Sequence, residues 1–121
     1  MAFSKDQSVS IHPYFKVGDG KMEAFKQYCE QFIAATHNEP KCLYYGFTFH
    51  DNEVYCREAY EDAEGVLAHI ANVGALLDAI LKIAEVMRLE IHGPESELAK
   101  LREPLAALNP TYFTLQYGIR R

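Results

Sequence analysis

The chain of 121 residues lacks several features that mark whole classes of protein. No apolar run approaches the roughly 20 residues that cross a bilayer, so we expect no membrane span. Lys and Arg number 12 against 17 Asp and Glu, and the basic residues are scattered, which argues against nucleic acid as a partner. HxxxH, HxH, CxxC and GxGxxG spacings are all missing. The sequence therefore predicts no metal site and no dinucleotide or phosphate loop.

Cysteine is also scarce. The three cysteines, Cys29, Cys42 and Cys56, are an odd number without paired spacing. The first ten residues, MAFSKDQSVS, lack the apolar core of a signal peptide. Both observations predict reduced thiols and a cytoplasmic protein.

The composition is that of a globular protein, with 49% apolar and 24% charged residues. We expect a single domain over residues 1–121, with a core in residues 8–92 and an added C-terminal helix and strand in residues 93–121. Periodicity and turn residues predict the following elements in chain order: a strand at 8–17, a helix at 21–36, strands at 42–50 and 53–60, a helix from about 62 to 84, a strand at 86–92, a helix from Pro94 and a strand at 111–119.

Two residues predict local irregularities. Pro13 has no N–H for a sheet ladder, so the first strand should lie at a sheet edge or carry a bulge. Gly74 weakens the middle of the second helix, where we expect a break or a kink. The helix from Pro94 should be disturbed at Glu103-Pro104, and its apolar stripe consists of Leu98, Leu101 and Leu105.

This order of elements is typical of the ferredoxin-like α+β fold, an antiparallel sheet with helices on one face. The opposite face of the sheet would be bare, yet it carries Tyr14, Tyr44 and Tyr55. A bare face of this kind is a large apolar patch for a monomer. We therefore expect a homodimer that pairs through the sheet face.

The stretch from 53 to 72, EVYCREAYEDAEGVLAHIAN, is the most informative part of the chain. It predicts a strand that leaves a two-residue Asp51-Asn52 turn and passes into a helix through Asp62, a good N-cap residue. Glu58 near the end of the strand and His69 on the helix should face the same space. The hairpin would place six side chains on one surface: Tyr45, Phe47, Phe49, Cys56, Glu58 and Tyr60.

Glu58 and His69 have two interpretations. As an acid–base pair, the carboxylate would fix the tautomer of the imidazole and raise its basicity, which suits His69 to take a phenolic proton. As a structural pair, the buried carboxylate would be satisfied by His69 or a tyrosine and would hold the helix on the sheet.

The neighbouring residues are candidates for ligand contacts. Tyr45 and Tyr60 carry hydroxyl groups that need partners. Phe47 could stack on a planar ligand or belong to the core. Asn72, one turn beyond the histidine, could orient a substrate oxygen, or it could serve as a helix-end cap or a surface residue.

The segment REAYEDAEGVLAHIANVG, from Arg57 to Gly74, resembles the signature of antibiotic biosynthesis monooxygenase-type domains. In that family, a strand with a glutamate is followed by an aromatic residue, an acidic helix start and a histidine one to two turns into the helix. These positions fall on Glu58, Tyr60, Asp62 and His69. The resemblance covers residues 8–92.

The resemblance implies a dimeric α+β barrel, with a pocket in each subunit between the sheet and its helices. Several members oxidise hydroquinone-like phenols with O₂ and use no metal, flavin or haem, so we expect no cofactor. His69 would be the base, Glu58 its orienter, and Tyr45 and Tyr60 substrate contacts. The alternative is a non-catalytic dimer that binds a small hydrophobic or aromatic ligand. Haem binding through His69 is disfavoured by the absence of tryptophan and of basic clusters.

Overall fold

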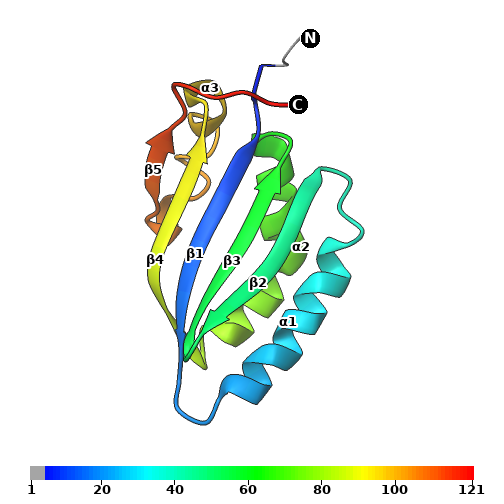
Figure 1. Cartoon of the computed structure of the whole chain (residues 1–121), viewed down its shortest axis with the longest axis vertical. Helices are drawn as coiled ribbons and strands as arrows, with labels where there is room; N and C mark the ends of the chain where they lie inside the picture. Colours follow the sequence, from blue (N-terminus) through cyan, green and yellow to red (C-terminus); the bar gives the residue numbers. More distant parts are fainter. Residues whose placement is uncertain (1–4) are drawn as a thin grey trace.

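The computed structural model describes residues 5–121 and has the predicted ferredoxin-like architecture (Figure 1). Its elements in chain order are β1 Val9–Val17, α1 Met22–Thr36, β2 Cys42–His50, β3 Glu53–Tyr60, α2 Ala63–Ile80, β4 Ala84–Gly93, α3 Glu95–Leu98, a 3₁₀ turn at Ala106–Leu108 and β5 Thr111–Thr114. The strands form one open five-stranded sheet in the order β2-β3-β1-β4-β5. β5 runs parallel to β4, whereas the other pairs are antiparallel.

The two long helices cover one face of this sheet and leave the other face bare (Figure 1). Alternate residues of β1 point to the helices and are buried: Val9, Ile11, Pro13, Phe15 and Val17. Side chains of α1 such as Phe25 and Phe32 pack against this face. Burial of large apolar side chains at roughly 1.5–3 kcal/mol each is what holds the layers together.

The β2–β3 hairpin has the predicted register. Phe49 lies opposite Val54, Phe47 opposite Cys56 and Tyr45 opposite Glu58. Asp51 takes a positive φ of 51°, as a residue in a tight turn often does. The predicted N-cap of α2 is also confirmed, because Asp62 accepts a hydrogen bond from the Gly65 N–H at 2.9 Å.

Pro13 does not lie on an edge strand. β1 is central, between β3 and β4, and the register of its pairing with β4 shifts between Tyr14 and Phe15. The prediction of an edge position or a bulge is therefore confirmed in its second alternative. The shift lies one residue beyond the proline, which cannot donate to either neighbouring strand.

Three other expectations are corrected. α2 runs through Gly74 without a break, because one glycine lowers helix stability by only about 1 kcal/mol and the apolar face is continuous. The third helix ends at Leu98, and irregular turns connect it to the 3₁₀ turn. Leu101 and Leu105 lie in these turns and are buried as predicted. The last strand ends at Thr114 instead of residue 119.

Within residues 5–121, one helix, α2, is long and apolar enough to cross a membrane by length and composition alone. Core helices pass the same test, and α2 buries Val66, His69 and Val73 against the sheet and α1.

Two glycines of α2 should respond in opposite ways to alanine. A Cβ at Gly65 would lie 2.9 Å from Lys41 Cβ and 3.1 Å from Tyr60 Cβ, so Gly65→Ala should destabilise the fold by about 1–3 kcal/mol. A Cβ at Gly74 meets nothing within 4 Å, so Gly74→Ala should stabilise it by about 0.5–1 kcal/mol. Thermal unfolding of both variants checks this pair. Equal changes in Tm would contradict the packing described for α2.

Candidate functional site

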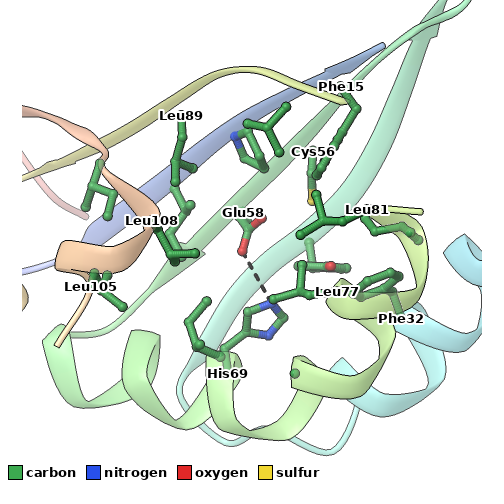
Figure 2. Close-up of a pocket in the computed structure, with 18 of the residues that line it drawn as sticks. Phe15, Phe32, Cys56, Glu58, His69, Leu77, Leu81, Leu89, Leu105 and Leu108 are labelled. Carbon is green, nitrogen blue, oxygen red and sulfur yellow. Dashed lines mark ion pairs between the residues drawn. The ribbon is translucent and has the colours of Figure 1, made fainter. Parts of the chain in front are cut away.

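A cavity of about 260 Å³ lies between the sheet and the helices. Its lining combines members of two buried apolar clusters, with Ile11 and Ile91 from one and Phe15 and Phe32 from the other. The cavity therefore lies between the two apolar clusters. Leu105 and Leu108, from the segment after β4, line it on one side (Figure 2). Its ionisable lining side chains are Tyr45, Cys56, Glu58, His69 and Asp78.

Glu58 projects from β3 into this apolar space and is 5% exposed. Its Oε1 accepts a hydrogen bond from the Tyr60 hydroxyl at 2.6 Å. The same oxygen lies 3.5 Å from His69 Nε2, on α2 (Figure 2). The structure therefore brings together the two residues that the sequence predicts as a pair.

The orientation of His69 is set from its other side. Its Nδ1 donates to Glu39, at 2.9 Å from Oε2 and 3.1 Å from Oε1. An ionised carboxylate only accepts, so the ring proton is assigned to Nδ1 and the neutral ring presents an unprotonated Nε2 to the cavity. The carboxylate that fixes the tautomer is thus Glu39, whereas Glu58 faces the basic nitrogen.

Burial sets the charges of this pair. It raises the pKa of Glu58 to about 7, although hydrogen bonds from Tyr60 and Cys56 act in the opposite direction. Burial also lowers the pKa of His69, against the effect of the Glu39 carboxylate. Near neutral pH the imidazole is therefore neutral and the Glu58 carboxyl is partly protonated. An acid and a base stand side by side in one apolar cavity.

The aromatic wall of the cavity is formed by β2. Tyr45 lies with its ring centroid 5.1 Å from that of His69 and 5.5 Å from that of Phe47. Phe47 lines the cavity, and its ring centroid also lies 5.9 Å from that of the core residue Phe32. Burial raises the pKa of the Cys56 thiol far above neutrality, which leaves it unreactive.

Two predicted ligand contacts lie elsewhere. Tyr60 is fully buried, and its hydroxyl is used by Glu58, so it acts on the site through that carboxylate. Asn72 is on the exposed side of α2, outside the cavity lining. Its amide donates to Glu39 Oε2 at 2.8 Å and to the Ala35 carbonyl at 3.0 Å. The side chain thus supports the residue that orients His69.

Sequence reasoning did not select Glu39, which lies 30 residues before His69 in the chain. The available signal was an acidic residue between the predicted end of the first helix and Pro40, and nothing in the sequence alone paired it with the histidine. Among residues 5–121 no group of three or more His, Cys, Asp and Glu could hold a metal ion.

No protein-family model matches the chain, and no curated protein sequence matches it. Among solved structures, the crystal structure of MupZ from Pseudomonas fluorescens is 43% identical, with 95% of each chain covered and a TM-score of 0.91. A protein from Bacteroides thetaiotaomicron, provisionally named an antibiotic biosynthesis monooxygenase, is 20% identical over 70% of this chain and 85% of its own, with a TM-score of 0.61. A protein from Chloroflexus aurantiacus with the same provisional name is 12% identical over 72% of this chain and 92% of its own, also with a TM-score of 0.61. At the two lower identities the likeness concerns the fold alone.

Proposed function

Because the chain belongs to one family with MupZ and has the antibiotic biosynthesis monooxygenase-type fold, we propose that it is an enzyme of acid–base type that acts on a small, largely apolar, hydroxylated molecule. The family resemblance read from Arg57–Gly74 is confirmed by these comparisons. One observation carries the proposal: His69 is held as the Nδ1–H tautomer by Glu39, and its free Nε2 faces the apolar cavity beside Glu58.

The first form of this chemistry is the oxidation of a hydroquinone-like phenol by O₂. His69 Nε2 takes the phenolic proton, and the resulting phenolate passes an electron to O₂. Tyr45, Phe47 and Phe32 form an aromatic wall suited to a planar ring. The reaction needs no metal, flavin or haem, so we propose none. His69 is the base, and Glu58 holds or returns the proton.

The second form of this chemistry is proton transfer without O₂. The raised pKa of the Glu58 carboxyl favours this form. A carboxyl group with a pKa of about 7 donates a proton at neutral pH, while the neutral His69 accepts one. This pairing suits isomerisation, elimination or hydrolysis. The largely aliphatic remainder of the lining, with Leu77, Leu89 and Ile91, fits a substrate with an aliphatic part.

Oxygen consumption decides between these forms. In the first experiment, O₂ uptake by the purified protein is measured with naphthohydroquinones and anthrones. In the second, the protein is incubated under argon with hydroxylated aliphatic compounds, and the products are analysed by mass spectrometry. We expect uptake of O₂ above the uncatalysed rate in the first form. Conversion under argon, with no O₂ uptake, would establish the second.

The rival function is a non-catalytic protein that binds a small hydrophobic ligand. It predicts ligand-dependent stabilisation of about 2.7 kcal/mol when the ligand is at a hundred times its Kd. It also predicts no product from that ligand. A compound that raises Tm and remains unchanged after prolonged incubation would support this rival against both catalytic forms.

The bare sheet face supports a homodimer. It carries Tyr14 stacked on Tyr55 with ring centroids 4.7 Å apart, and Arg57 over the Tyr44 ring at 4.8 Å. Tyr44 is 45% exposed, and a second sheet would cover it. We expect sedimentation at micromolar concentration to give about twice the mass of 13.8 kDa, and Tyr14→Glu to shift the mass towards the monomer. A wild-type monomer would exclude pairing through this face.

We also propose a cytoplasmic location. Cys29, Cys42 and Cys56 are all free thiols in the structure. Burial raises the pKa of Cys29 and of Cys42 to about 11, so both thiols are protonated near neutral pH. Such thiols suit a reducing compartment.

A further inference from the structure

Glu39 lies in the loop between α1 and β2, where its main-chain N–H donates to the Thr36 carbonyl at 2.9 Å. Its carboxylate accepts from His69 Nδ1 and from the Asn72 amide, at 2.9 Å and 2.8 Å. Asn72 is itself anchored on the Ala35 carbonyl. The carboxylate is therefore held by two residues of α2, one of which is anchored on α1, and it is hydrogen-bonded to the buried imidazole.

The far side of Glu39 meets a second hollow, open to the surface and about 240 Å³ in volume. Its lining consists of Ile33, Thr36, His37, Glu39, Cys42 and Tyr45. Tyr45 also lines the inner cavity, so its ring borders both spaces, whereas His69 lines the inner cavity alone. His69 presents Nε2 to the inner cavity and Nδ1 to the carboxylate that borders the outer hollow.

A neighbouring hydroxyl marks this hollow as a place for water. Thr36 Oγ1 is buried and has no hydrogen-bond partner among the described residues. Buried polar atoms of this kind are usually satisfied by an ordered water when space is available. A water bonded to Thr36 in the hollow would stand next to the Glu39 carboxylate.

The geometry points to a proton path: Glu39 is a positioning residue for His69 and the outer end of a path that joins the imidazole to solvent on the side away from the apolar cavity. This inference rests on the proposed acid–base function. Other titratable side chains near the imidazole are Glu58 and Tyr60 from β3 and Tyr45 and Cys42 from β2, and His37 borders the hollow. Burial raises the pKa values of Cys42, Tyr45 and Tyr60, so these groups are neutral near pH 7, and the Glu39 carboxylate is the group that raises the pKa of His69 against the effect of burial.

Each step of the path moves one proton and no electron. A proton taken at Nε2 makes the ring an imidazolium, and the Nδ1 proton then passes to Glu39 and on to water in the hollow. In the second half of the cycle, Nδ1 recovers a proton through Glu39 as Nε2 returns its own proton to the reacting molecule or to an ionised Glu58, so the ring is never left as an anion. Release and uptake balance over the cycle.

Nitrogen NMR of the His69 ring tests the positioning role without any substrate. The variants are Glu39→Ala and Glu39→Gln, with Glu30→Gln, an exposed carboxylate of α1, as the matched control. We expect the Nδ1–H tautomer in the wild type and the control. The Nε2–H form should dominate in Glu39→Ala, since that proton can bond Glu58. In Glu39→Gln, the imidazole pKa should fall by about one pH unit.

Formate supplies the test of the path itself, because it can replace the deleted carboxylate from the hollow. In Glu39→Ala it should restore the Nδ1–H tautomer and raise turnover at least about tenfold, with no effect on Glu30→Gln. A wild-type tautomer and titration in Glu39→Ala would overturn the inference. So would a restored tautomer without any gain in turnover. If the wild type converts no substrate, the proposed function fails while the NMR result still decides the role of Glu39. Should Glu39→Ala not fold, the imidazole pKa in Glu39→Gln decides the positioning role, and a value equal to that of the wild type would overturn it.

Discussion

His69→Gln should lower turnover of the enzyme's substrate by about 10²- to 10⁴-fold, the range expected for loss of a general base. Glutamine keeps a polar side chain that can donate to Glu39, but it has no nitrogen that accepts a proton at neutral pH. The change is measured as kcat with saturating substrate. Since the imidazole is only 3% exposed, circular dichroism and Tm must accompany the kinetics.

The control for this prediction is Glu30→Gln, which removes a charge from the exposed side of α1 and should leave kcat unchanged. A structural role for the Glu58–His69 pair predicts the opposite pattern for His69→Gln. Tm would then fall by several degrees and turnover per folded molecule would stay within about twofold of the wild type. That result would remove His69 from the catalytic machinery and leave it as a core residue.

The stability of the fold should decrease as pH rises from about 5 to about 8, and Glu58 is the cause. Its pKa is raised from 4.5 to about 7 by burial, so the folded state holds a proton that the unfolded state has lost. The stabilisation is fully present below pH 4.5 and is lost as pH passes through about 7. The difference amounts to about 3 kcal/mol.

Glu58→Gln isolates this effect, because the amide has the shape of the neutral carboxyl and does not titrate. Urea unfolding at pH 5 and pH 8 should show a smaller loss of stability in the variant than in the wild type. His69 opposes the trend, since its lowered pKa makes it a source of stability that is lost as pH falls. The comparison therefore uses the difference between the variant and the wild type. An identical pH slope in both proteins would mean that Glu58 is ionised throughout.

Local patterns in the sequence were sufficient for most of the fold. Alternation along residues 42–60 and a two-residue turn determine the hairpin register, so the opposition of Tyr45 and Glu58 follows directly. The pairing of Glu58 with His69 also follows, because the strand end and the first turns of the next helix are adjacent in space. These contacts depend on residues that are close in the chain.

The features that escaped prediction depend on packing between distant segments. Glu39 reaches His69 only because α1 and α2 lie side by side on the sheet, a contact across 30 residues of chain. The missing donor of Pro13 predicted an edge position or a bulge, and the sequence could not decide between them, because the order of strands depends on which apolar faces meet. The last strand stops at Thr114, because its partner β4 ends at Gly93, and the Leu115 N–H beyond it still bonds that strand, at 2.7 Å from the Gly93 carbonyl.

The gap between the two apolar clusters makes the protein responsive to hydrostatic pressure. Unfolding removes the internal void of about 260 Å³, and this loss favours the denatured chain when the system is compressed. A molecule that fills the space cancels much of that volume change. The unfolding pressure of the unliganded protein therefore depends on the volume of the empty cavity. A compound that fills the cavity should raise this pressure, even if its binding changes no spectroscopic signal.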